Sequence, residues 1–302
     1  MTLAHHPSIL KLLEQTAHLQ SPTRPLAVFD CDGTVIHGDI GEAVFFRQIE
    51  EFMFRVSPAA LWPDYPQRDE LDRLYRKLDA VEMKDRRAHP DFEVFAGHLL
   101  SWYYDQLAAG IVAKGCADIV RLFAGFTVAE VRDLAARTLT LELKAPLGTR
   151  ELGGRKVHTG VRFMREPLEL MRLLQERDFD IWAVSGSSAW SVEPVFERLG
   201  VPAHQVIGIS LECPNGTLSG MAVEPIPIRA DKVQALQARE ARVPHLVASD
   251  SRNDIPLLLY SSCVKVWVNG RHRSKREFFT AVGSEPDDQW LLIEEPTILH
   301  HN

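Results

Sequence analysis

The chain has 302 residues, 45% of them hydrophobic, and carries 34 basic against 41 acidic residues, for a formal net charge of −7. This length allows roughly two domains and a sizeable core. The acidic balance argues against a nucleic-acid or anionic-membrane partner, so we expect a small molecule as the ligand.

The four cysteines, Cys31, Cys116, Cys213 and Cys263, show no CxxC spacing. They predict neither a zinc knuckle nor a disulfide framework, and their use suits a reduced cytoplasm. The N-terminal residues do not form the basic region and apolar core of a signal peptide, and no apolar run approaches the roughly 18 residues of a membrane span. We therefore expect a cytoplasmic protein without a membrane partner.

A short helix is expected over residues 7–19, and the first strand follows it. This strand, residues 26–29, is apolar and is followed by Asp30, Asp32 and Gly33. Because strand side chains alternate with a period of two, both carboxylates face one site. Beyond the end of a buried parallel strand, such a pair offers a nucleophile or metal ligand beside an acid/base. The same residues also suit an Asp-rich turn that Gly33 closes.

A helical pattern replaces the strand pattern from about residue 40 to about residue 143. Helical segments are expected at residues 42–54, 68–78, 92–107 and 128–141. Residues 148–163, with Gly153 and Gly154 in the middle, predict a hairpin. We interpret residues 40–160 as an inserted helical cap, and residues 1–39 and 161–302 as the two parts of the core domain.

After the insertion, helices and apolar strands alternate. The expected order is helix 167–177, strand 181–184, helix 192–199, strand 206–211, helix 232–241, strand 245–248 and strand 264–268. This alternation predicts an α/β fold with a doubly wound parallel sheet.

Three further polar sites fall at the ends of these elements. Ser185 and Gly186 follow a strand, where a hydroxyl and free backbone N–H groups suit an anion; an N-cap cluster is the alternative. Lys232 begins a helix, where a cation needs an anionic neighbour unless it simply lies on the surface. Asp250 and Asp254 follow another strand, and their oxygens suit Mg²⁺, although a solvated Asp-rich loop would have the same composition.

In order, residue type and context, the four sites resemble the signature of the haloacid dehalogenase superfamily. Residues 30–34 match its first motif, Ser185 its second, Lys232 its third, and Asp250 with Asp254 its fourth. The helical block occupies the position of the cap in that superfamily. The spacing is most similar to the phosphoserine-phosphatase branch, which includes phosphatases of phosphocholine and phosphoethanolamine.

The resemblance implies a Mg²⁺-dependent phosphomonoester hydrolase with a mobile cap that closes over its substrate. Asp30 would attack phosphorus to form an aspartyl-phosphate, and Asp32 would protonate the leaving alkoxide and then activate water. Asp30, Asp250 and the backbone carbonyl of Asp32 would hold Mg²⁺, and Asp254 would orient metal-bound water or Lys232. Superfamily dehalogenases and aspartyl-phosphate ATPases lack an acid at the position of Asp32, so this residue favours ester hydrolysis.

The resemblance also implies that Ser185, Gly186, Lys232 and Asn253 bind the phosphoryl oxygens. Ser249 departs from the branch, which commonly has glycine at this position. Two alternatives remain open: transfer of the phosphoryl group to an alcohol, and a non-catalytic binding or regulatory module on the same fold.

Asp39 stands where phosphoserine phosphatases carry an acid that meets the substrate amine, so an amino-alcohol or amino-acid phosphate is expected. Residues 39–42 also form a capping-box sequence for the first cap helix. Aromatic residues of the cap offer either a cage for a quaternary ammonium or ordinary packing; they are Trp62, Tyr65, Trp102, Tyr103 and Tyr104. Three arginines near the end of the cap are candidates for a substrate carboxylate or are surface residues; they are Arg150, Arg162 and Arg165.

Overall fold

Six parallel strands form the central sheet of the computed structural model, which describes residues 3–19 and 24–300. Their order across the sheet is β10, β9, β8, β1, β6, β7. Their bounds are β1 Leu26–Phe29, β6 Asp180–Ser188, β7 Val206–Ile209, β8 Leu246–Ser249, β9 Val264–Val268 and β10 Trp290–Ile293. Ala27 of β1 pairs with Ile181 of β6 on one side and with Leu246 of β8 on the other. The first strand therefore lies inside the sheet, and its end can meet the ends of both neighbours.

Helices cover both faces of this sheet. Alternate side chains of β1 divide between two cores: Ala27 and Phe29 pack with α1, α9 and α10, and Leu26 and Val28 with α11, α12 and α13. Burial on both faces explains why the strand is continuously apolar. These helices are α1 Pro7–Thr16, α9 Arg165–Gln175, α10 Ala189–Glu197, α11 Asp231–Gln237, α12 Ile255–Tyr260 and α13 Lys275–Val282. The predicted doubly wound α/β fold is confirmed.

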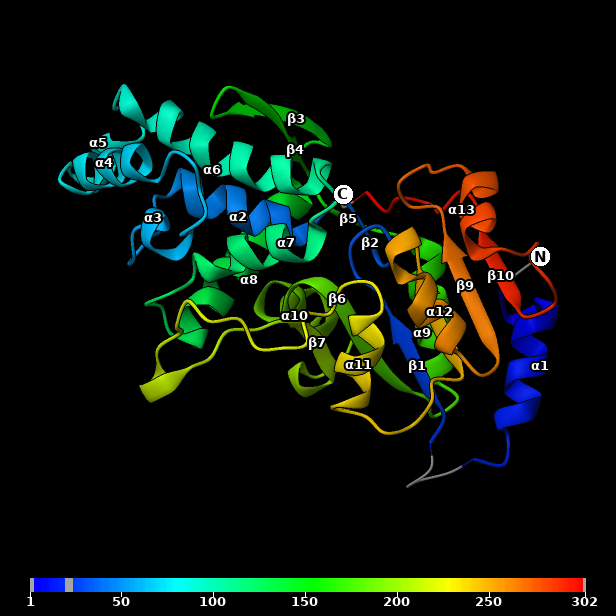
Figure 1. Cartoon of the computed structure of the whole chain (residues 1–302). Coiled ribbons are helices and arrows are strands. Elements are labelled where there is room, and N and C mark those ends of the chain that lie inside the picture. Colours follow the sequence, from blue (N-terminus) through cyan, green and yellow to red (C-terminus); the bar gives the residue numbers. More distant parts are fainter. Residues whose placement is uncertain (1–2, 20–23, 301–302) are drawn as a thin grey trace.

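A helical insertion leaves this core directly after β1 and returns before α9 (Figure 1). It comprises α2 Ile40–Glu50, α3 Pro58–Leu61, α4 Arg68–Asp79, α5 Met83–Arg86, α6 Asp91–Ala108, α7 Val112–Arg121, α8 Val128–Lys144 and the hairpin of β3 Gly148–Leu152 with β4 Arg155–Thr159. The antiparallel pair of β2, Ile36–His37, and β5, Arg162–Phe163, joins its two ends. Gly38 and Gly160 adopt positive φ angles of 98° and 82° beside this pair, so the outgoing and returning chains run together.

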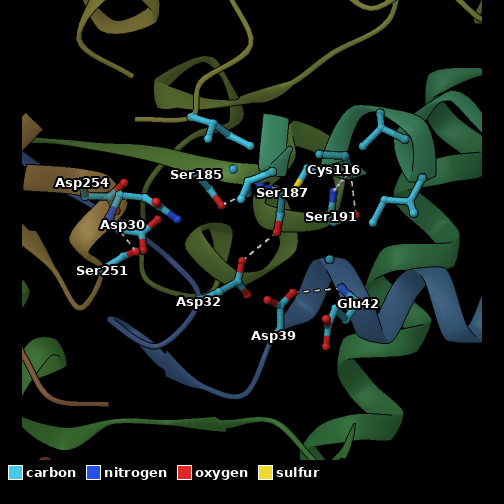
Figure 2. A pocket seen from close by; sticks show the side chains of 18 of the residues that line it. Asp30, Asp32, Asp39, Glu42, Cys116, Ser185, Ser187, Ser191, Ser251 and Asp254 are labelled. Carbon is cyan, nitrogen blue, oxygen red and sulfur yellow. Dashed lines mark hydrogen bonds between the residues drawn. The ribbon is translucent and has the colours of Figure 1, made fainter. Parts of the chain in front are cut away.

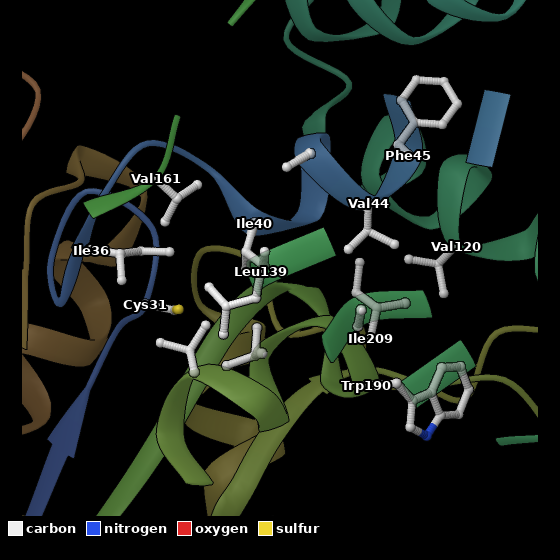
Figure 3. Close-up of a cluster of buried hydrophobic side chains, with 14 of the residues drawn as sticks. Cys31, Ile36, Ile40, Val44, Phe45, Val120, Leu139, Val161, Trp190 and Ile209 are labelled. Carbon is white, nitrogen blue, oxygen red and sulfur yellow. The ribbon is translucent and has the colours of Figure 1, made fainter. Parts of the chain in front are cut away.

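The insertion packs closely on the core. Side chains of Val44, Val120 and Leu139 from α2, α7 and α8 meet Trp190 of α10 and Ile209 of β7 in one buried cluster (Figure 3). Because this contact removes apolar side chains from water, it stabilises the association of the insertion with the core.

A segment between β7 and α11 makes a second contact with the insertion. The backbone N–H of Gly125 donates to the carbonyl of Leu218 at 2.8 Å, and the N–H of Leu218 donates to the carbonyl of Phe126 at 2.8 Å. Four short 3₁₀ helices complete the chain: Leu3–His5, Ala203–Gln205, Pro214–Gly216 and Arg252–Asp254.

Several elements differ from the sequence expectation. The strand expected at residues 181–184 continues to Ser188, with an irregular register to β7 after Val184. Strand β10 and helix α13 were not predicted, because Trp290–Ile293 is short and flanked by polar residues. Among the described helices, none is both long and apolar enough to cross a bilayer.

Candidate active site

A pocket of 160 Å³ lies at the carboxyl ends of β1, β6 and β8, beneath the helical insertion (Figure 2). In an open parallel sheet this is the edge where ligands bind. The residues predicted for catalysis, phosphate binding and metal binding all line it, together with Asp39: Asp30, Asp32, Asp39, Ser185, Gly186, Lys232, Asp250, Asn253 and Asp254.

Lys232 is buried between two carboxylates. Its Nζ donates to Asp30 Oδ1 at 2.9 Å and to Asp254 Oδ2 at 2.7 Å, and the residue is 4% exposed. Burial alone would lower the pKa of Lys232, but the charges of Asp254 and Asp30 outweigh it and raise that pKa. Lys232 is therefore a charged group beside Asp30, and the alternative of a surface lysine is wrong.

Ser249 gives Asp254 a second partner. Its Oγ donates to Asp254 Oδ2 at 2.6 Å, the same oxygen that faces Lys232. The departure from glycine at this position thus adds a hydrogen bond that orients Asp254. With this oxygen occupied by two donors, Asp254 positions Lys232 in the structure.

Asp32 faces the start of the insertion. Its Oδ1 accepts from the backbone N–H of Ile40 at 2.7 Å, and its Oδ2 accepts from Ser187 Oγ at 2.7 Å. Burial raises the pKa of Asp32 well above its ordinary value, and the charge of Asp39 raises it further. A carboxyl with a raised pKa holds its proton to higher pH than an ordinary aspartate does, which suits it to donate that proton to a leaving group.

Asp250 carries a buried oxygen without a hydrogen-bond partner. This atom, Oδ2, lies 3.4 Å from Arg271 Nε and 3.7 Å from Arg273 Nε. Burial raises the pKa of Asp250 to about 7, although both guanidinium groups oppose the shift. The backbone N–H of Asp250 donates to Thr34 Oγ1 at 2.9 Å, which joins the ends of β1 and β8.

These residues fit a magnesium ion. Within residues 3–19 and 24–300, no three His, Cys, Asp or Glu side chains converge as a metal site. Mg²⁺ does not require such a cage, because it keeps several waters and binds one or two carboxylates with substrate phosphate. Asp30 and the unpartnered oxygen of Asp250 supply that chemistry at one end of the pocket.

Gly33 shapes the same corner. Its φ is +80°, and a Cβ there would lie 2.4 Å from Asp250 Oδ2 and 2.6 Å from Arg271 Nε. Only glycine combines this backbone conformation with so close an approach.

Three serines, Ser185, Ser187 and Ser188, lie at the end of β6. Ser185 is buried within the strand rather than beyond it, and its Oγ accepts from the backbone N–H of Ser187 at 3.1 Å. Ser188 caps α10, because its Oγ accepts from the backbone N–H of Ser191 at 3.1 Å. The expected N-cap therefore exists, but Ser188 makes it, which leaves Ser185 and Gly186 facing the pocket.

Asp39 is the N-cap of α2. Its Oδ1 accepts from the backbone N–H of Glu42 at 2.9 Å, and its Oδ2 accepts from Arg271 Nη2 at 3.3 Å. The N-cap half of the predicted capping box is thus confirmed, whereas the side chain of Glu42, its other half, bonds with Tyr103 and Tyr104. Both oxygens of Asp39 have partners.

Glu42 is a pocket residue that the sequence interpretation missed. It hydrogen-bonds with Tyr103 and Tyr104, and burial together with the charge of Asp39 raises its pKa to about 8. The pocket wall of the insertion is otherwise mainly apolar, with Phe45 and Phe123 among its residues. The sequence could have indicated this role only through the position of Glu42, in the first turn of the helix that follows Asp39.

Most of the proposed aromatic cage lies elsewhere. Trp62, Tyr65 and Trp102 contact one another inside the insertion, and both indole N–H groups donate to Asp118. Of the five aromatic residues, Tyr103 alone lines the pocket. Packing within the insertion is the correct interpretation of the other four.

The three arginines expected near the cap exit do not line the pocket either. Arg150 pairs with Glu50 at 3.0 Å. Arg162 donates to the carbonyl oxygens of Glu142 and Ala145. Arg165 begins α9 on the core.

The family model of haloacid dehalogenase-like hydrolases matches residues 27–259. The chain belongs to this family. The superfamily and the hydrolase class expected from the four motifs are thereby confirmed.

Two solved proteins of unknown function share this fold. A functionally unknown protein of Anaerococcus prevotii DSM 20548 is similar at a TM-score of 0.70 and 18% identity, over 91% of this chain and 87% of that chain. A protein of unknown function from Bordetella pertussis Tohama I is similar at a TM-score of 0.55 and 15% identity, over 89% and 98% of the two chains. A phosphoserine phosphatase with a phospho-aspartyl intermediate analogue has a TM-score of 0.42 and 13% identity, over 90% and 94%. No curated protein matches the sequence.

Proposed function

We propose that this hydrolase is a Mg²⁺-dependent phosphatase of small phosphomonoesters, of the phosphoserine-phosphatase-like branch. The observation that carries the proposal is the pair Asp30 and Asp32 in one pocket, one beside Lys232 and the other with a raised pKa. An aspartate carboxylate can attack phosphorus as a nucleophile, and a carboxyl whose pKa is raised is better suited to act as an acid.

The reaction has two steps. Asp30 attacks phosphorus and the P–O bond to the alcohol breaks, while Asp32 gives its proton to the departing oxygen. Asp32, now a carboxylate, then takes a proton from water, which attacks the aspartyl-phosphate and restores Asp30. Lys232, Ser185, Gly186 and Asn253 would bind the phosphoryl oxygens during both steps.

Asp30, Asp250 and the backbone carbonyl of Asp32 would hold Mg²⁺, while Asp254 keeps Lys232 in place. When bound, Mg²⁺ supplies positive charge between the nucleophile and the phosphate. The unpartnered oxygen of Asp250 supports this assignment.

The substrate class that the pocket supports is an amino-alcohol or amino-acid phosphate, such as phosphoserine, phosphocholine or phosphoethanolamine. Asp39 lines the pocket, and its carboxylate charge favours a cation on the leaving alcohol. Residues 40–160 would act as the cap, with residues 1–39 and 161–302 as the core, in a cytoplasmic enzyme.

The test is phosphate release from a panel of these esters and of sugar phosphates, with and without Mg²⁺. Asp30→Asn should reduce turnover by about 10⁴-fold, because it removes the nucleophile. Asp288→Asn is the matched control and should keep full activity. Asp288 is exposed, pairs with Lys11 and does not line the pocket.

Metal-dependent release that Asp30→Asn abolishes supports the proposal. A folded protein that releases phosphate from no ester contradicts hydrolysis. Transfer of the phosphoryl group to an added alcohol would instead show a phosphotransferase.

A further inference from the structure

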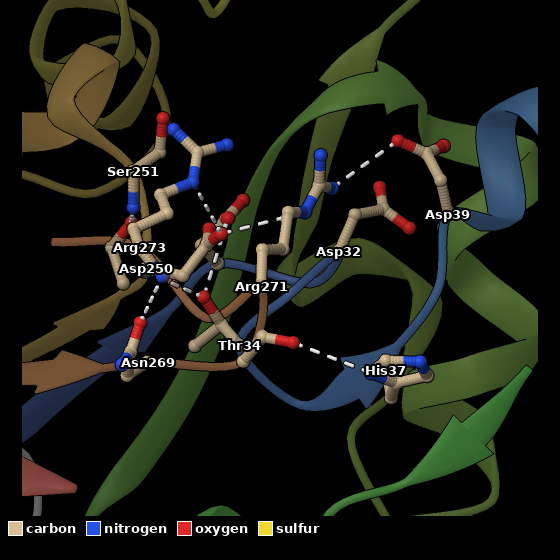
Figure 4. A network of polar contacts seen from close by, with 12 residues as sticks. Asp32, Thr34, His37, Asp39, Asp250, Ser251, Asn269, Arg271 and Arg273 are labelled. Carbon is tan, nitrogen blue, oxygen red and sulfur yellow. Dashed lines mark hydrogen bonds and ion pairs between the residues drawn. The ribbon is translucent and has the colours of Figure 1, made fainter. Parts of the chain in front are cut away.

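The loop after β9 brings two guanidinium groups to the carboxylate proposed to bind Mg²⁺ (Figure 4). Arg271 and Arg273 both approach Asp250 Oδ2, at 3.4 and 3.7 Å, and this buried oxygen accepts no hydrogen bond. Asp250 Oδ2 is therefore close to both guanidinium groups but accepts a hydrogen bond from neither of them.

Arg271 differs from Arg273 because it also reaches the insertion. Its Nη2 lies 3.3 Å from Asp39 Oδ2, so one guanidinium lies between the end of β8 and the N-cap of α2. For Arg273, the only ion pair in the described part of the chain is with Asp250. Arg271 thus connects the metal corner of the pocket with the first helix of the insertion.

The loop holds Arg271 in this position. A Cβ on Gly270 would lie 2.0 Å from the carbonyl oxygen of Gly33, so the loop packs directly on the turn after β1. His37 Nδ1 lies 3.3 Å from the carbonyl oxygen of Gly270 and adds a contact to β2. The backbone at Arg271 is therefore fixed, while its side chain has two carboxylates within reach.

Two cations that use one buried carboxylate oxygen compete for it. Charges a few ångströms apart interact strongly where water is excluded, so a guanidinium on Asp250 lowers the affinity of that carboxylate for Mg²⁺. The coupling is reciprocal, and Mg²⁺ on Asp250 weakens the contact of Arg271 by the same free energy. Asp39 offers Arg271 a second partner at no change of backbone.

We propose that Arg271 is an internal counter-ion of Asp250 that competes with Mg²⁺, and that it gives up Asp250 and keeps Asp39 when the metal binds. Arg271 is a positioning residue in this scheme. When Mg²⁺ occupies Asp250, Asp39 is the carboxylate that remains to Arg271, and Arg271 contributes less to stability than it does without the metal. The inference rests on the proposed function, because it takes Asp250 as a Mg²⁺ ligand.

The experiment measures Mg²⁺ binding to the full-length protein by calorimetry, and thermal unfolding with and without saturating Mg²⁺. Arg271→Gln should bind Mg²⁺ about fivefold more tightly than the wild type, because the competing charge is gone. Its Tm should be lowered mainly without Mg²⁺, since that is the state in which Asp250 needs the guanidinium.

Asp39→Asn is the decisive companion variant, because it should act in the opposite direction. Asparagine is as good an N-cap as aspartate, so α2 keeps its start. Without the second carboxylate Arg271 stays on Asp250, and Mg²⁺ affinity should fall by about threefold. Arg273→Gln is the matched control on the arginine side and should tighten Mg²⁺ binding less than Arg271→Gln.

A Tm loss in Arg271→Gln that is equal with and without Mg²⁺, with an unchanged Kd, overturns the inference and makes Arg271 purely structural. If Arg271→Gln does not fold, Arg271→Lys takes its place: one ammonium cannot hold both carboxylates, so Mg²⁺ should still bind more tightly than in the wild type. A wild type that binds Mg²⁺ and hydrolyses esters, with both variants unchanged in Kd, overturns this inference alone. A wild type that binds no Mg²⁺ overturns both the inference and the metal part of the proposed function.

Discussion

At the scale of single residues, the site contains buried charged groups that compensate one another's charge. Lys232, Asp30 and Asp254 are each less than a tenth exposed, and each loses most of its hydration on folding. A buried ion pair contributes little net stability, but removal of one member leaves its partner charged and unpaired.

Lys232→Met is therefore expected to lower both activity and stability. Two buried carboxylates would face each other without a cation, at a cost of about 3–5 kcal/mol in the free energy of unfolding. Turnover should fall by at least about 100-fold, because a fixed cation at the phosphate site is lost. Urea denaturation and phosphate release measure the two effects.

Lys265→Met is the matched control. Lys265 is also buried, but its Nζ donates to Gln289 and lies outside the pocket. This variant should lose about 1 kcal/mol and keep its activity. Equal losses of stability in the two variants would show that the charge at position 232 has no special partners.

Glu42→Gln tests whether the pKa of Glu42 is raised in the folded protein, through the pH dependence of stability. The pKa of Glu42 in the folded protein is about 8, above its ordinary value of 4.5, so the folded state keeps a proton that the unfolded state releases. Stability from this group is present below about pH 4.5 and is lost as pH rises towards about 8. As pH rises across this window, the Tm of the wild type should fall relative to the Tm of Glu42→Gln, because glutamine does not titrate. A difference that is constant between pH 5 and 8 would contradict it.

At the scale of elements, local sequence signals set the boundaries that matter for the site. The capping box of α8 is one example: Glu130 N–H donates to Thr127 Oγ1 at 3.3 Å, and Thr127 N–H donates to Glu130 Oε2 at 2.9 Å. Such a cap stabilises the start of a helix without touching the pocket.

Thr127→Ala should therefore lower the free energy of unfolding by about 1 kcal/mol and leave kcat and KM unchanged. Chemical denaturation and steady-state kinetics on the same preparation measure both. A change of KM would show that the start of α8 affects the pocket, contrary to its position.

The same scale explains what could be predicted from the sequence. Asp30 and Asp32 follow β1, Asp254 follows β8, and Lys232 lies in the first turn of α11. Because the carboxyl ends of parallel strands meet at one edge of the sheet, the convergence of these residues follows from the α/β pattern. Arg271 and Glu42 could not be placed in this way. The contact of Arg271 with Asp39 spans 232 residues and depends on a loop without periodicity.

Helices and strands were predicted correctly where the hydrophobic pattern of the sequence extended over many residues. Helices α2, α4, α6 and α8 of the insertion and the apolar strands β8 and β9 were expected near their observed bounds, whereas α3, α5 and α7 were not predicted. The end of β6 was not, since Ser185 to Ser188 resemble a loop and become part of the strand only beside β7. Tertiary pairing overrides local propensity there.

At the scale of the whole molecule, the insertion is held to the core by more than its two chain connections. Helix α8 packs along α10, and Leu218, which is 2% exposed, pairs through its backbone with Gly125 and Phe126. By contrast, Arg229 makes the contact at the pocket rim through one 3.4 Å hydrogen bond from Nη2 to the carbonyl of Gly110. The rim is therefore easier to open than the packed side.

This difference predicts how substrate reaches the pocket. If the whole insertion swung away, the backbone hydrogen bonds of Gly125 and Leu218 would break in every cycle, and their amides would exchange quickly with solvent. We expect these two amides to exchange as slowly as those of β6 and β8, and the segment around Gly110 to exchange faster and to slow when inorganic phosphate and Mg²⁺ are added. Hydrogen exchange followed by mass spectrometry measures all of these segments in one experiment. Rapid exchange at Gly125 and Leu218 that ligand suppresses would contradict this expectation, because it would show that the insertion and the segment around Leu218 separate when substrate enters.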